Sequence, residues 1–214
     1  MTKLLSPRMK NLSSFSVKQV EQRVVLNYVR IQTNSNKFYI MEFQEGEGEF
    51  SYRIFIEYGR MGSPPRRHER YFQSRLETRE AFDRILNSKR KKGYELILIE
   101  EEWENDCYIQ ISGFTPKNII YPNDPSPTLP SHTTPFGKLS EIQIHRGLLI
   151  LTEIEKSIQN ERHDVIDLSN KFYSLIPVAF GSSIDRNYIL DTMTKVQEKK
   201  EWLNQMINDS TIFK

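Results

Sequence analysis

The stretch from Tyr52 to Ser63, which reads YRIFIEYGRMGS, constrains this chain most strongly. Side chains that would share one face of a β-strand recur at every second position, and these are Tyr52, Ile54, Ile56 and Tyr58. The strand then runs into Gly59-Arg60-Met61-Gly62, where glycines permit a tight turn that a Cβ would strain. We expect this unit to set the ring of Tyr58 beside the guanidinium of Arg60.

An aromatic ring beside a guanidinium suits a nucleotide. A base or sugar packs on the ring, while the guanidinium binds phosphate oxygens in a bidentate manner. An ordinary strand end is the alternative, because tyrosine is common in strands and arginine is common in turns. Tyr58 and Arg60 taken alone do not decide between the two.

Composition allows one large domain or two small ones. The chain has 214 residues, of which 37% are hydrophobic and 27% charged. Its net charge of +2 is too small to indicate a nucleic-acid binder, so the distribution of charge matters more than the total. Cations crowd the stretch from Arg60 to Lys92, and acids follow from Glu100 to Asp106. The sequence therefore predicts a basic surface in the middle of the chain.

Several classes of protein fit the sequence poorly. The single cysteine, Cys107, has no partner for an intrachain disulfide, and no apolar run approaches the roughly 20 residues that span a bilayer. We expect a soluble intracellular protein without membrane contact. There is no glycine-rich phosphate loop, and the histidines lack metal-ligand spacing, so we expect no metal, no cofactor and no catalytic residue.

The first half of the chain predicts an α+β module over residues 20–102, a small antiparallel sheet crossed by one helix. Residues 1–19 are expected to form a basic, disordered arm. Strands are predicted over residues 20–31, 37–43, up to Tyr58, 70–73 and 94–99, and a helix capped by Thr78 over residues 77–91. Pro64-Pro65-Arg66-Arg67 is expected to be a loop.

The second half predicts a small all-α bundle over residues 137–214. A proline-rich linker over residues 103–136 precedes it. Ser140 and Gln143 have the spacing of a capping box at the start of the first helix. Further helices are expected from about Asp164 to Pro177 and over residues 187–208.

Two groups of motifs resemble the poly(ADP-ribose) polymerases. Tyr58-Gly59-Arg60, with YRIFIE before it and Asn36-Lys37-Phe38-Tyr39 upstream, resembles the WGR domain of that family, which has tryptophan at the position of Tyr58. The strings PFGKLS at 135–140 and DLSNKFYSLIP at 167–177 resemble the helical regulatory domain. In that family a long helix opens the regulatory domain, whereas here the proline-rich stretch occupies that place.

The resemblance implies a function. The family's WGR domain engages a DNA break and contacts the helical domain, whose unfolding exposes an NAD site in a following transferase domain. Carried over to this chain, the resemblance implies that Arg60 also contacts the helical domain. The nucleic-acid-binding residues that it implies are Tyr58, Gly59, Arg60, Asn36, Lys37, Arg53, Arg66 and Arg67. DNA ends or nicks are the expected partner, with RNA as the alternative, and the family implies a nuclear location.

Three hypotheses follow. The transferase domain is recognised by a histidine followed by glycine, and His68, His132, His145 and His163 all lack that glycine. We therefore expect a non-catalytic regulatory protein that binds DNA ends. The second hypothesis is the regulatory part of an ADP-ribosyltransferase whose catalytic domain lies on another chain or is missing from the gene model. The third is a structural module for protein interactions.

Overall fold

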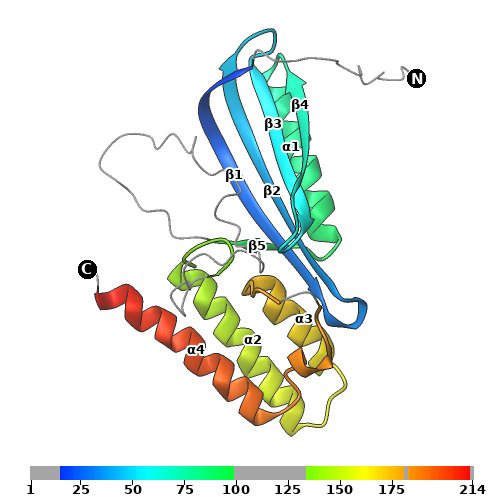
Figure 1. Cartoon of the computed structure of the whole chain (residues 1–214), viewed down its shortest axis with the longest axis vertical. Helices are drawn as coiled ribbons and strands as arrows, with labels where there is room; N and C mark the ends of the chain where they lie inside the picture. The colour runs from blue at the N-terminus through cyan, green and yellow to red at the C-terminus, as the bar shows by residue number, and fades with distance from the viewer. Residues whose placement is uncertain (1–14, 99–133, 181–182, 213–214) are drawn as a thin grey trace.

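The computed structural model describes residues 15–98, 134–180 and 183–212. Its first part is a five-stranded antiparallel sheet with the order β4-β3-β2-β1-β5. The strands are β1 (Ser16–Arg30), β2 (Ser35–Glu47), β3 (Tyr52–Arg60), β4 (Arg66–Phe72) and β5 (Glu95–Ile97). Helix α1 (Arg75–Lys91) packs on one face of this sheet (Figure 1). This confirms the predicted α+β class and the single crossing helix.

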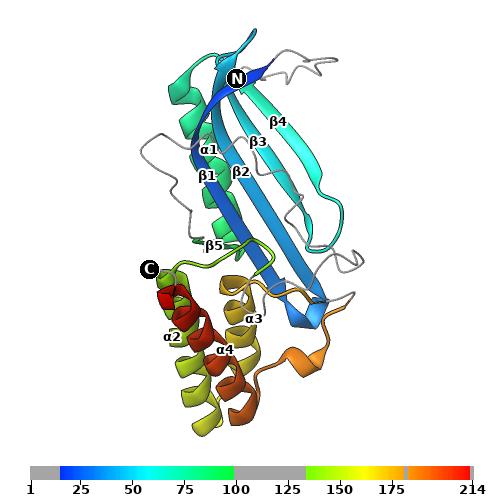
Figure 2. The same cartoon turned by 60° about the vertical axis from the view of Figure 1, so that its left-hand side comes forward.

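Three helices follow the sheet: α2 (Glu141–Gln159), α3 (Val165–Leu175) and α4 (Met193–Ile212). Short 3-10 turns, η1 (Ile31–Thr33) and η3 (Arg186–Tyr188), lie between elements. The helices gather at one end of the sheet, where β5 and the ends of β1 and β2 reach them (Figures 1 and 2). In the part of the chain that the structure describes, no helix is long and apolar enough to cross a membrane.

The alternation along the strands divides the sheet into two faces. One face packs against Ala81 and Phe82 of α1 and contributes Val24, Leu26, Tyr39, Met41, Phe43, Ile54 and Ile56. The other face contributes Val25, Val29, Phe38 and Ile40 to a core that continues into α2, α3 and α4. At this junction the rings of Phe38 and Phe136 lie 6.4 Å apart, edge to face. Sheet and helices thus share one hydrophobic core.

The boundaries of the strands differ from the predictions. β1 is one strand that begins at Ser16, so residues 16–19, which we expected in the arm, belong to the sheet. β4 begins at Arg66, whereas the sequence placed Arg66 and Arg67 in a loop. Pro64 and Pro65 lie just before this edge strand, where the missing amide of a proline disrupts no ladder.

Helix α1 begins two residues earlier than predicted, and its cap is Ser74. Ser74 has extended dihedrals and its hydroxyl accepts a hydrogen bond from the amide of Glu77. Thr78, the predicted cap, is buried one turn inside and donates its hydroxyl to the carbonyl of Ser74 at 2.7 Å. At the other end, Gly93 adopts a φ of 85°, which favours glycine and ends the helix as predicted.

The helical half follows the predicted pattern with two corrections. Ser140 caps α2 as expected, but Gln143 does not return a bond to it, because the amide of Ser140 donates to the carbonyl of Leu98 at 3.0 Å. The Gln143 side chain donates instead to the carbonyl of Leu175 at 2.6 Å. α4 begins at Met193, and the residues predicted to start it form the turn η3. Most of the predicted linker lies outside the described residues, although Phe136 at its end is packed in the core.

Candidate nucleic-acid interface

The candidate site lies where helix α1 stops short of the end of the sheet. Tyr58 and Arg60 are two residues apart on β3, so they share the face that α1 covers. On the adjacent strand Tyr39 lies opposite Tyr58, and Lys37 lies opposite Arg60. The last turn of α1 places the Nζ of Lys89 3.7 Å from the centre of the Tyr39 ring. Lys37, one row further along β2, is exposed.

Tyr58 is half-buried and helps to line a pocket at this end of the sheet. Its ring lies 5.9 Å from that of Tyr39. Lys37, Arg60, Arg66 and Tyr94 also line the pocket, and Arg66 is the register partner of Tyr58 on β4. An aromatic side chain and several cations therefore converge on one concave surface.

The turn after β3 differs from the prediction. Gly59, expected in the turn, is a strand residue paired with Phe38. A Cβ at Gly59 would lie 3.5 Å from the Phe38 ring, an ordinary contact. The turn follows Arg60, where Gly62 has a φ of 79° and the amide of Ser63 donates to the carbonyl of Arg60 at 3.1 Å. As a strand, the Tyr58-Gly59-Arg60 segment holds the side chains of Tyr58 and Arg60 on one face of the sheet.

Arg60 is bound to a turn that reaches the helices. Its guanidinium donates to the main-chain carbonyl of Asn34 and, at 2.8 Å, to the Asn34 side-chain oxygen. That same oxygen accepts the amide of Ile184 at 2.9 Å. Asn34 adopts the left-handed region, with φ 48°, which asparagine tolerates better than most residues. Arg60 is therefore connected through Asn34 to the segment that precedes η3.

Three predicted site residues lie elsewhere. Asn36 is buried, with 3% of its surface exposed. Arg53 and Arg67 lie on the opposite face of the sheet, where the Nε of Arg53 donates to Gln44 and that of Arg67 to Glu57, each at 2.7 Å. The structure brings together Tyr58, Gly59, Arg60, Lys37 and Arg66, and it does not bring Asn36, Arg53 or Arg67 to them.

An aromatic and cationic group beside Tyr58 was not predicted from the sequence. Tyr94 stacks on Tyr28 at 5.3 Å, and the Nζ of Lys89 lies over the rings of Tyr39 and Tyr94. Burial, and then the charges of Lys92 and Lys37, lower the pKa of Lys89. A signal was present, because Lys89 lies seven residues after Phe82 and continues the apolar stripe of α1. Burial also raises the pKa of Tyr39 to about 12.

Comparison with known families divides the chain at the same place as the fold. Residues 22–100 match the WGR domain, and residues 128–210 match the family described as poly(ADP-ribose) polymerase, regulatory domain. The chain contains a WGR domain followed by a poly(ADP-ribose) polymerase regulatory domain. Both expected resemblances are thereby confirmed. Among the described residues, no group of histidine, cysteine and acidic side chains could hold a metal ion.

Curated relatives extend over both domains. Poly [ADP-ribose] polymerase 2 of Arabidopsis thaliana is 22% identical over 222 residues, which cover 85% of this chain and 35% of the relative. Poly [ADP-ribose] polymerase of Sarcophaga peregrina is 26% identical, with 86% of this chain and 22% of the relative covered. Poly [ADP-ribose] polymerase 1 of Gallus gallus is 33% identical over 76 residues, 35% of this chain and 7% of the relative. The chain spans about a third or less of these relatives.

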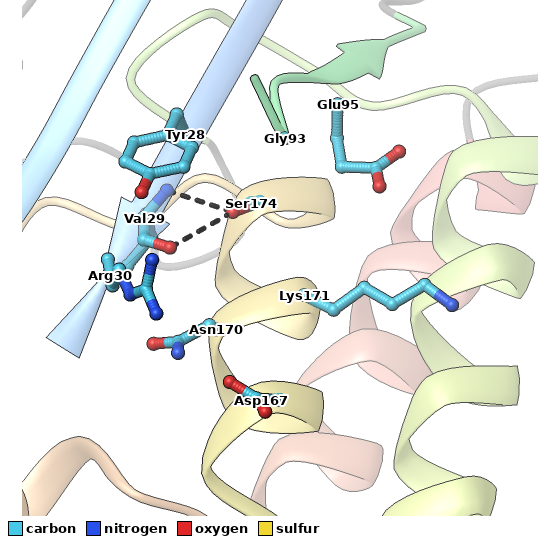
Figure 3. A pocket seen from close by; sticks show the side chains of 9 residues that line it. All are labelled: Tyr28, Val29, Arg30, Gly93, Glu95, Asp167, Asn170, Lys171 and Ser174. Carbon is cyan, nitrogen blue, oxygen red and sulfur yellow. Dashed lines mark hydrogen bonds between the residues drawn. The ribbon is translucent and has the colours of Figure 1, made fainter. Parts of the chain in front are cut away.

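The regulatory domain holds the free edge of strand β1 with side chains of α3. The amide of Val29 donates to the Ser174 hydroxyl at 2.8 Å, and the amide of Ile31 donates to Asn170 Oδ1 at 2.8 Å. Figure 3 shows Ser174 and Asn170 facing this strand, with Tyr28 and Gly93 at the upper end of a pocket between the domains. Strand β5 pairs with residues 25–27 of β1 and is too short to reach further along that strand. The side chains of α3 therefore supply the hydrogen-bond partners for the amides of Val29 and Ile31.

The WGR domain in turn caps the end of α3. Asn27, on β1, donates its side-chain amide to the carbonyls of Tyr173 and Ser174 at 2.9 and 3.3 Å. These carbonyls belong to the last turn of the helix, which has no partners of its own for them. The two domains therefore satisfy each other's main-chain groups.

Proposed function

We propose that the WGR domain binds a nucleic-acid end in the Tyr58 pocket and that Arg60 transmits binding to the regulatory domain through Asn34. The observation that carries the proposal is the convergence of Tyr58, Lys37 and Arg66 on one pocket. Arg60 also lines this pocket, and it is bound to Asn34, which accepts the amide of Ile184. DNA is the expected nucleic acid because of the family, and a nuclear location belongs to the same proposal.

The role of each side chain follows from its chemistry. Tyr58 would stack on the terminal sugar or base, since an exposed end offers a planar face that paired bases inside a duplex do not. Lys37 and Arg66 would bind the flanking phosphates. Arg60 would keep its bonds to Asn34 and respond to a phosphate nearby by shifting that turn. Asn36, Arg53 and Arg67 have no part in this arrangement because of their burial or their place on the opposite face.

Binding measured with nicked, blunt-ended and closed circular duplexes across a salt series tests the proposal. We expect ends and nicks to be preferred, and Tyr58→Ala to weaken end binding by about 1–3 kcal/mol if one base stacks there. Lys37→Ala and Arg66→Ala should each lower the slope of log affinity against log salt by about 1.

Matched controls are available on the same domain. Tyr71→Ala removes a ring from the opposite face, and Arg84→Ala removes an exposed cation from α1. Both should leave end binding unchanged. Equal affinity of wild type and Tyr58→Ala for ends would remove the stacking role. Failure of the wild type to bind any nucleic acid at low salt would instead favour a structural interaction module.

A second candidate function is regulation of an ADP-ribosyltransferase domain. The hydrogen bonds from Arg60 to Asn34 and from Ile184 to Asn34 favour it, because they join the Tyr58 pocket to the regulatory domain. In this case the chain would alter the NAD consumption of a catalytic domain supplied separately. The test adds the chain to a purified transferase domain, with and without nicked DNA. Arg60→Ala should abolish any DNA-dependent effect, whereas Arg84→Ala should retain it.

A further inference from the structure

We propose that the WGR domain also binds a single-stranded extension of the nucleic-acid end, along a surface that leads from Tyr58 past Tyr94 to the C-terminal turn of α1. We call this surface the tyrosine path, and define it by Tyr28, Tyr39, Tyr58, Tyr94, Lys89, Arg90 and Lys91. It rests on the proposed function, because the end bound at Tyr58 is where the extension would begin. It adds a second binding region and names the class of end that the protein prefers.

The rings of the path follow one another across the sheet. From Tyr58 to Tyr39 the ring centres are 5.9 Å apart, from Tyr39 to Tyr94 6.4 Å, and from Tyr94 to Tyr28 5.3 Å. Tyr39 is buried and supports the others, while Tyr28, Tyr58 and Tyr94 are half-buried and reach the surface. Successive bases stack on such aromatic side chains without regard to sequence, because every base has a π-face.

The surface is continuous. Tyr94 lines the Tyr58 pocket and also a neighbouring depression with Asn87, Arg90, Lys91 and Glu95. Gly93 makes this possible, since it turns the chain with a φ of 85° and lies against the ring of Tyr28. A ligand that fills only the Tyr58 pocket would leave the second depression empty. A polymer that leaves the pocket at Tyr94 would enter it.

The charges along the path suit a phosphate backbone. The Nζ of Lys89 lies 5.2 Å from the centre of the Tyr94 ring, which lines both pockets, and Arg90 and Lys91 line the second one. Among the described residues that line the two pockets, Glu95 is the one acid, and it is paired with Arg146 at 3.5 Å. Lys37 adds another cation to the path, with its Nζ 6.0 Å from the centre of the Tyr28 ring. Rings with cations between them are the features that hold single strands in grooves.

Single-stranded nucleic acid fits better than a duplex or a small nucleotide. Inside a duplex, neighbouring base pairs cover both faces of each base, so several rings in succession can stack only on the bases of a single strand. The path extends over two pockets, whereas one mononucleotide would occupy one of them. Its cations alone would also attract other polyanions, so the test must separate stacking from charge.

The experiment compares two ends on the full chain: a blunt duplex, and the same duplex with a single-stranded extension of about six nucleotides, within the range of such sites. We expect the extended end to bind about tenfold more tightly or better. The exposed pair Arg90→Ala/Lys91→Ala should lower this ratio several-fold and leave blunt-end affinity unchanged. Arg84→Ala, on the same helix, should change neither value.

Two substitutions of Tyr94 distinguish base stacking from attraction of the phosphates by the cations. Tyr94→Phe should keep the preference for the extension, and Tyr94→Ala should bring the ratio close to one. Equal binding of blunt and extended ends by the wild type would overturn the path while leaving Tyr58-dependent end binding intact. A preference that polyphosphate removes as well as an oligonucleotide does, and that Tyr94→Ala retains, would also overturn it. If the wild type binds no nucleic acid, both the tyrosine path and the proposed function fail.

Discussion

Replacing Asn27 by alanine tests how firmly the two domains are joined. Asn27 is 1% exposed and lies on β1, and its side-chain amide donates to the carbonyls of Tyr173 and Ser174. Alanine would leave both carbonyls buried without these donors. It would also shorten a side chain inside the shared core.

The magnitude follows from these contacts. A hydrogen bond contributes about 1 kcal/mol net, and a buried carbonyl left without a donor costs about 1–3 kcal/mol. Against this, the Oδ1 of Asn27 is buried without a hydrogen-bond partner among the described residues, so its removal relieves a cost. The cost of the lost hydrogen bonds is partly offset by the removal of this unpartnered oxygen. We therefore expect the free energy of unfolding to fall by about 1–3 kcal/mol.

Urea unfolding of the full chain measures the loss, and hydrogen exchange locates it. Because sheet and helices share one core, a single transition should shift to lower urea, and exchange should rise first in the last turn of α3. Gln19→Ala, an exposed change on the same strand, is the control. If Asn27→Ala is as stable as Gln19→Ala, the carbonyls of α3 do not depend on the sheet and the reasoning fails.

Three further changes have expected outcomes. Gly147→Ala should lower the urea midpoint, because the Cβ of the new alanine would lie 2.7 Å from the Ile176 side chain. This effect should exceed the gain of about 1 kcal/mol in helix propensity. A higher midpoint would show that the helices can move apart. Burial raises the pKa of Glu42, partly opposed by a hydrogen bond from Gln44, so the folded state binds the proton more tightly. The stability of wild type relative to Glu42→Gln should therefore increase as pH falls from neutral towards 4.5, and parallel pH profiles would contradict this. Ser140→Ala should cost about 1 kcal/mol by loss of the α2 cap, as chemical denaturation would measure, and an unchanged midpoint would show that the cap is not needed.

Alternation in the sequence predicted the sheet and could have refined the site. The period-two pattern placed Tyr58 and Arg53 on opposite faces of β3, and the structure keeps them there. The family resemblance assigned both to one binding set, although they lie on opposite faces of the strand. Arg67 was displaced in the same way, because β4 begins earlier than the prolines suggested and alternation then directs its side chain to Glu57.

Other features depend on contacts between distant segments. Lys89 falls near the end of the helix predicted over residues 77–91, and only its position over the Tyr39 ring places it beside Tyr58. The role of Asn27 depends on α3, 146 residues away in the sequence from its first acceptor. Gln143 fitted a capping box by spacing, yet Leu175 offers a buried acceptor that local sequence does not reveal.

The side chains that hold the edge of the sheet have a consequence for handling the protein. Val29, Ile31 and Leu98 each place an amide against a side chain of the helices. If the WGR domain were produced alone, these amides would form an open strand edge, and open edges recruit strands from other molecules. The isolated sheet should therefore self-associate and precipitate, whereas in the full chain the helices should keep it soluble by covering this edge.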